Sequence, residues 1–181
     1  MPTDTNIKTT GNAWVYKIIC WAFVISLVFS LVNASVMPRL PLWGGALFLF
    51  GFIVIGIFFD IIATAAAVAS QTPFHSMNTR GIKGAKHALT LIRNGEKVTN
   101  FCGDVVGDVC GIMSGGALVI LIDTMVKEHG FPLLYTGLLL TAVVASLTIG
   151  GKAISKSYSL RNGNQIIYQT ALFICLFKGE Q

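Results

Sequence analysis

The chain has 181 residues, of which 54% are hydrophobic and only 12% are charged, and its mean hydropathy is +0.71. Soluble domains carry about 25% charged residues, so this composition excludes a disordered chain, a basic nucleic-acid-binding domain and most soluble enzymes. We therefore expect a membrane protein with no nucleic-acid partner and no enzymatic activity. The net charge of +5 is typical of a membrane protein with basic cytoplasmic loops.

The first apolar block covers residues 13–36, which is long enough for a membrane-spanning helix of about 20 residues. We predict that it is an additional, retained N-terminal helix. A signal anchor or a cleaved signal peptide is the alternative, because Lys8 and Lys17 precede the apolar run and Val32-Asn33-Ala34 fits a small-residue cleavage pattern.

The remaining apolar blocks predict three further spans, over residues 42–70, 101–126 and 131–150. Between the first two of these, residues 77–94 have apolar positions at helical spacing with basic residues on the other faces, which predicts an amphipathic helix at the membrane surface. Residues 165–177 are too few to span and predict an interfacial helix, or one packed beneath the bundle. The predicted fold is all-α, a polytopic membrane helix bundle forming one membrane domain.

The distribution of basic residues predicts the orientation. If both termini are cytoplasmic, only Arg39 and Lys127 of the 13 Lys and Arg residues lie outside. Basic residues concentrate in cytoplasmic loops, so we expect a multi-pass protein of the cell membrane with both termini in the cytoplasm.

Acidic residues inside the predicted spans are the most informative feature. Asp60, Asp104 and Asp108 lie within apolar stretches, where a carboxylate is costly unless it faces protein or water and has a partner. Asp104 and Asp108 are one helical turn apart, and Thr64 is one turn after Asp60. Oxygen ligands suit hard divalent cations such as Mg²⁺. We therefore predict a metal site formed by Asp60, Thr64, Asp104 and Asp108.

Two other interpretations of these aspartates stay open. The carboxylates can form a proton relay, since chains of acidic residues also serve proton-coupled carriers. They can also be structural, with an aspartate paired to Lys152 at the end of the last span. The first interpretation indicates a carrier, and the second a scaffold or accessory subunit.

A row of glycines frames the acidic residues. Gly103, Gly107, Gly111 and Gly115 recur every four residues, which lets another helix approach closely. The small residues 63–67 of the preceding span are a suitable partner for this row.

Four segments, taken in order, resemble a known family. They are a helix end at residues 59–65 (FDIIATA), a basic helix at 84–92 (GAKHALTLI), Gly107-Asp108, and an ending at 150–156 (GGKAISK). The transmembrane domain of the CorC/CorB and CNNM magnesium transport proteins has a Phe-Ser-Gly-x-Glu-Thr-Ala helix end, a cytoplasmic belt helix, a Gly-Asn helix and a Gly-Glu-x-x-Pro-Lys ending. The resemblance covers roughly residues 42–168.

The chain departs from this pattern at the charged positions. The family's Ser falls at Asp60 and its Glu at Ala63, the Asn falls at Asp108, and the second Glu and the Pro fall at Lys152 and Ser155. Acidic positions are therefore relocated rather than kept.

The resemblance implies a divergent homodimeric member that transports a divalent cation such as Mg²⁺. Members of that family usually carry nucleotide-sensing CBS domains after the membrane part. We expect none in this chain, which ends at Gln181, so the resemblance does not imply nucleotide regulation.

Overall fold

The computed structural model describes residues 12–178, and every regular element in them is a helix, which confirms the all-α prediction. The elements in chain order are α1 (Asn12–Val36), the short 3₁₀ helix η1 (Met37–Arg39), α2 (Leu42–Val68), α3 (Thr72–Thr79), α4 (Ala85–Arg93), α5 (Gly95–Thr99), the π-helix η2 (Asn100–Gly107), α6 (Asp108–His129) and α7 (Leu133–Lys178).

Four helical segments are long and apolar enough to cross a membrane: residues 16–39, 42–68, 95–129 and 133–176. The third is a continuous rod in which α5, η2 and α6 follow one another without a break. Large apolar side chains cover the outside of the bundle, and Trp43, Leu47 and Leu139 are examples that are more than two-thirds exposed. Such a surface needs lipid rather than water around it, so the chain is a membrane protein.

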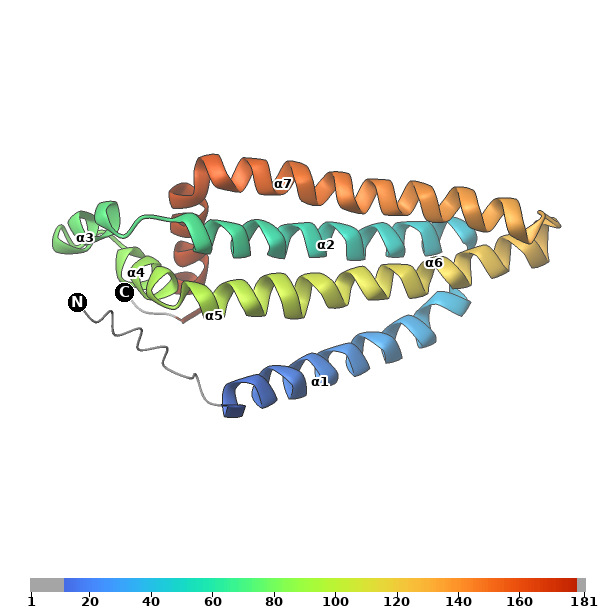
Figure 1. Ribbon diagram of the computed structural model, residues 1–181, viewed down its shortest axis with the longest axis horizontal. Coiled ribbons are helices and arrows are strands. Elements are labelled where there is room, and N and C mark those ends of the chain that lie inside the picture. Colours follow the sequence, from blue (N-terminus) through green and yellow to red (C-terminus); the bar gives the residue numbers. More distant parts are fainter. Residues whose placement is uncertain (1–11, 179–181) are drawn as a thin grey trace, which may run out of the picture.

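Helix α2 is the centre of the bundle. It packs between α7 on one side and the α6 rod on the other, and α1 lies beyond α6, as Figure 1 shows. Its apolar face meets α6 through Leu49, Ile53, Leu118 and Leu121, all of them buried. Because α2 touches both neighbours along its length, polar residues on α2 can reach groups on α6 and on α7.

Turn residues separate the helices. Pro41 precedes α2, and Gly130 ends α6 in the left-handed conformation at φ +67°, as glycine commonly does after a helix. We call the end of the bundle with η1 and Gly130 the hairpin end. The opposite end holds α3 and α4, with Lys83 in the connection between them and Lys86 in α4, and we call it the basic end.

The polar connection at the basic end differs from the single helix expected over residues 77–94. It forms two short helices, α3 and α4, separated by Gly81 and Gly84, which have φ of +68° and +83°. These left-handed glycines reverse the chain, because residues with a Cβ adopt such values only at a cost. Helix α4 then turns Ala88 and Leu89 into the interior.

Helix α7 changes direction at Asn162, whose backbone is not helical at φ −118° and ψ 21°. Beyond that residue the helix turns and runs across the direction of the other helices at the basic end (Figure 1). There Ile167 and Ala171 are fully buried in a cluster with Phe74 and Ala88. The Asn164 side chain also accepts a hydrogen bond of 2.8 Å from the Ser70 amide, so this segment closes the basic end of the bundle.

Candidate functional site

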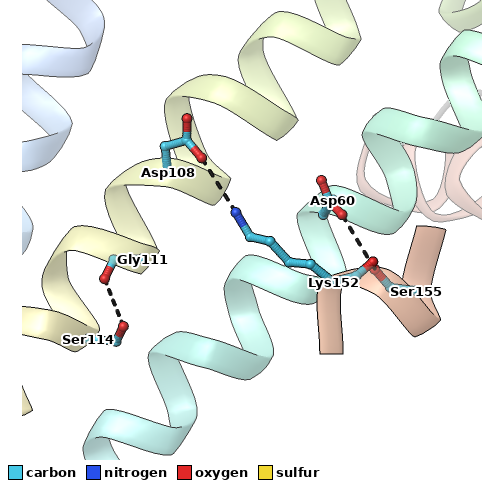
Figure 2. A network of polar contacts seen from close by, with 6 residues as sticks. All are labelled: Asp60, Asp108, Gly111, Ser114, Lys152 and Ser155. Carbon is cyan, nitrogen blue, oxygen red and sulfur yellow. Dashed lines mark hydrogen bonds and ion pairs between the residues drawn. The ribbon is translucent and has the colours of Figure 1, made fainter. Parts of the chain in front are cut away.

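The intramembrane charges gather around one turn of α7. Lys152 and Ser155 lie three residues apart there, and each contacts an aspartate from a different helix (Figure 2). Asp60 comes from α2 and Asp108 from the start of α6. Two acidic residues far apart in the sequence therefore lie at the same level of the bundle.

The Lys152–Asp108 contact joins α7 to α6. The lysine Nζ atom lies 3.4 Å from Asp108 Oδ1, and Figure 2 shows its side chain reaching across α2 to the carboxylate. The lysine side chain is 34% exposed and that of Asp108 64% exposed. A separation of 3.4 Å is long for a charge-assisted hydrogen bond, so the contact between Lys152 and Asp108 is weak. Both side chains remain partly exposed at the surface of the bundle.

Within residues 12–178, Asp60 has one weak partner. The Ser155 hydroxyl lies 3.4 Å from Asp60 Oδ2 and 2.8 Å from the Lys152 carbonyl oxygen. A hydroxyl carries one hydrogen, so the two acceptors compete for it, and the shorter contact is the better hydrogen bond. The half-buried Asp60 carboxylate is thus poorly compensated for a group inside an apolar span.

The charge balance of the site follows from these contacts. Asp60 and Asp108 together carry two negative charges, and Lys152 supplies one positive charge to Asp108. The formal charges of these three side chains therefore sum to −1. The site thus has capacity for further positive charge.

The other two predicted ligands lie outside this arrangement. Thr64 is half-buried one turn beyond Asp60, and Asp104 is exposed within η2, one turn nearer the basic end than Asp108. Within residues 12–178 there is no group of three or more His, Cys, Asp or Glu side chains placed to hold a metal ion. In the described part of the chain, Asp108 therefore lies beside Lys152 and Asp60 beside Ser155, and the expected three-carboxylate cluster is not formed.

Two serines of α7 have a part that the sequence analysis did not assign. Ser155 contacts Asp60, and the fully buried Ser159 donates a 3.0 Å hydrogen bond to the Ile61 carbonyl oxygen. Lys152, Ser155 and Ser159 are spaced at i, i+3 and i+7, which places them on one face of a helix. This spacing is the sequence signal that could have indicated a polar face on α7.

The glycine row divides between two environments. A Cβ on Gly103 would lie 3.3 Å from Ala63, which confirms that small residues of α2 pack against the start of the row. Gly111 and Gly115 have nothing within 4 Å of that position and lie on the open face of α6. An i+4 row drifts about 40° per step around a helix of 3.6 residues per turn, so one straight seam cannot contain all four.

The π-helix η2 leads directly into Asp108. A segment of eight residues in this conformation is unusual, and π-turns occur frequently at functional sites. It contains Asp104 and ends at Gly107. A Cβ atom on Gly107 would lie 3.9 Å from the carbonyl oxygen of Gly56 on α2. The segment therefore sets how the first turn of α6, with Asp108, meets α2.

Comparison with known proteins adds no family assignment: no protein-family model, curated protein or solved structure matches this chain.

Proposed function

We propose that this chain is a cation-transport protein of the cell membrane whose cargo is a divalent ion of the Mg²⁺ type. The observation that carries the proposal is that Asp108 contacts Lys152 and Asp60 contacts Ser155, so carboxylates from two spans approach the same turn of α7. When no ion is bound, the ammonium group of Lys152 contacts Asp108 and neutralises its charge in place of the transported ion.

The charges support a divalent cargo. When Lys152 swings away from Asp108, two carboxylates with a combined charge of −2 remain, which one divalent ion neutralises. The long contact and the partial exposure of both side chains make that displacement cheap compared with breaking a fully buried ion pair, which costs about 3–5 kcal/mol.

The small number of carboxylates suits Mg²⁺ in particular. This ion keeps several of its waters and commonly binds through one or two carboxylates. The Ser155 hydroxyl, which contacts Asp60, supplies a neutral oxygen to such a hydrated ion. Asp104, exposed nearer the basic end, would attract cations toward the site. The resemblance to the CorC/CorB and CNNM proteins supports the same cargo class.

The assembly that we propose is a homodimer with both termini in the cytoplasm. Asp108, Gly111 and Gly115 lie on an open face of α6, and a carboxylate there would face hydrocarbon in a lone copy. A second copy, or water held between two copies, would shield it.

Flux into proteoliposomes tests the proposal. Vesicles containing an internal Mg²⁺ indicator should fill when the wild-type protein is present. Asp60→Asn and Asp108→Asn should each lower the apparent affinity about tenfold, the equivalent of about 1.4 kcal/mol of lost ion binding. Asp123→Asn is the matched control, because Asp123 pairs with Lys127 near the hairpin end and should leave flux unchanged. Equal flux in all four proteins would refute the proposal.

A second candidate is a non-transporting scaffold or accessory subunit. It is favoured by the Lys152–Asp108 contact, which already neutralises one aspartate, and by the lack of a three-ligand group in the described part of the chain. Lys152→Gln separates the two candidates. It should raise Mg²⁺ affinity if Lys152 competes with the cargo, whereas a static pair predicts only a loss of stability.

A further inference from the structure

A second site lies beside the bend of α7 at Asn162, at the basic end of the bundle. It is a pocket with a volume of about 280 Å³, formed by the residues around the bend and by the end of α2, where the last part of α7 turns across the bundle (Figure 1). Most of the residues that line it are polar, namely Ser70, Arg161, Asn162, Asn164 and Gln165. The charged turn with Lys152 does not contribute to this lining, so the pocket is separate from the candidate cation site.

Tertiary contacts fix the walls of the pocket against each other. The Asn164 side chain accepts a hydrogen bond of 2.8 Å from the Ser70 amide, which joins the bend to the chain that follows α2. Gly163 is buried beside it, and a Cβ on this glycine would lie 2.8 Å from Val68 Cγ2. The bend therefore packs tightly on the last turn of α2, and the fold holds the polar groups in place before any ligand binds.

The pocket offers hydrogen-bond donors without a negative charge. Among residues 12–178, Arg161 forms no ion pair and the Gln165 side chain forms no hydrogen bond. Asn164 accepts through its amide oxygen, and within the same residues its NH₂ group has no acceptor. No acidic side chain of the described chain lines the pocket. A guanidinium group beside amide NH₂ groups suits a phosphate, which accepts paired hydrogen bonds from arginine.

The pocket also lies at the boundary of the apolar layer. Val68 is the last residue of α2 and Leu160 lies two residues before the bend, and these two lining side chains are 44% and 56% exposed. Both belong to segments that are apolar enough to span a membrane, so they meet acyl chains at the level where the headgroups begin. An occupant that satisfies both kinds of wall needs a phosphate and an apolar chain.

We propose that this pocket binds an anionic phospholipid, with its phosphate at Arg161 and Asn164 and an acyl chain along Leu160 and Val68. The charge of the lining favours an anionic lipid over a zwitterionic one. The ammonium group of a zwitterionic headgroup would lie near Arg161 with no carboxylate of the pocket to pair with, and like charges repel. The proposal does not depend on cation transport.

A tryptophan at the rim of the pocket gives a direct test. The sequence contains three tryptophans, so the full chain with Trp14→Phe, Trp21→Phe, Trp43→Phe and Leu160→Trp has only the one at position 160, where the native side chain is exposed. It is reconstituted into vesicles that contain an equal small fraction of either dibrominated phosphatidylglycerol or dibrominated phosphatidylcholine. We expect stronger quenching by the anionic lipid. Equal quenching by the two lipids would overturn the proposal.

Variants of basic residues locate the preference. In the reporter chain, Arg161→Gln should lower the preference for the anionic lipid about fivefold, the contribution expected of one basic residue near a membrane surface. The matched control is Lys156→Gln, which removes one charge from an exposed position of the same helix outside the pocket. If the control lowers the preference as much as Arg161→Gln does, the effect is general surface attraction and the proposal fails.

Asn164→Asp tests the second donor while keeping the tertiary contact. The new carboxylate still accepts from the Ser70 amide, but it lacks the NH₂ group and carries a negative charge that repels phosphate. The preference for the anionic lipid should fall at least as far as with Arg161→Gln, with the thermal unfolding of the lipid-free protein unchanged. A preference equal to that of the parent reporter would contradict the placement of the phosphate.

Inorganic phosphate separates a lipid from a free anion. Adding it at a concentration of about 10 mM, with ionic strength balanced by chloride because salt screens surface charge, should leave the quenching by brominated phosphatidylglycerol unchanged. Loss of the preference with phosphate but not with chloride would mean that the pocket takes a soluble phosphate, and the lipid site would be rejected.

Discussion

Ser159 on α7 donates its hydroxyl hydrogen to the carbonyl oxygen of Ile61 on α2, at 3.0 Å and with no exposure of the serine. The bond lies one residue after Asp60 in α2 and one turn after Ser155 in α7. It therefore fixes the two helices against each other directly beside the charged site.

Replacing this serine should loosen the α2–α7 contact. Ser159→Ala should lower the free energy of unfolding by about 1 kcal/mol, the net worth of a typical intramolecular hydrogen bond. Thermal unfolding in detergent micelles measures the change. Ser157→Ala is the control, because Ser157 is exposed on the same helix. An equal effect of the two substitutions would show that the Ser159 bond contributes nothing specific.

Exchanging the charges of Asp108 and Lys152 tests their coupling. Lys152→Asp alone places a second carboxylate beside Asp108 and should lower the free energy of unfolding by about 1 kcal/mol, a small cost because the contact is long and partly exposed. The double variant Asp108→Lys with Lys152→Asp should recover most of that stability, since the opposite charges still face each other. A double-mutant cycle gives the coupling energy.

The same exchanged pair also distinguishes the two candidate functions. A transport site should not recover with stability, because the exchange moves a carboxylate from α6 to α7 and places an ammonium group beside the turn that begins α6. Recovery of both stability and Mg²⁺ flux would contradict the role assigned to Asp108.

Gly95 marks the closest approach of α5 to the end of α2. A Cβ on this buried glycine would lie 2.9 Å from the Ala66 carbonyl oxygen, which belongs to the backbone and cannot rotate away. Gly95→Ala should therefore destabilise the fold by about 1–3 kcal/mol, as overpacking substitutions do. Gly137→Ala is the control, because nothing lies within 4 Å of the new methyl group. It should be neutral or stabilising by up to about 1 kcal/mol through helix propensity.

The segment of α7 beyond Asn162 should behave as part of the core. Ile167→Ala should cost about 2–5 kcal/mol, the usual range for truncating a buried aliphatic side chain, because Ile167 is fully buried with Phe74 and Leu89. The truncation should also speed proteolysis at the α3–α4 turn, which this segment supports. Leu176→Ala should change neither readout, since Leu176 is 81% exposed. If this segment does not pack against the bundle, both substitutions should have equally small effects.

Periodicity and hydropathy predicted the helical class and the four apolar segments, because spanning length and apolar content are local properties of the chain. That Asp60 and Asp108 approach the same turn of α7 was also foreseeable in part, from their similar depths and from Lys152 as an available cation. The contact of Ser155 with Asp60 was not, since the spacing of Ser155 from Lys152 places both on one face of a helix but does not say which neighbour that face meets.

The sequence by itself determined that this chain forms apolar helices with a few carboxylates inside them, since each of those properties resides in a single segment. Only the tertiary structure decided which carboxylate meets Lys152, that Asp104 stays outside the site, and that Gly111 and Gly115 remain on an open face. The physical reason is the rotation of each helix about its axis. Packing against α2, together with the π-helix before Asp108, sets that rotation, and no local pattern specifies it.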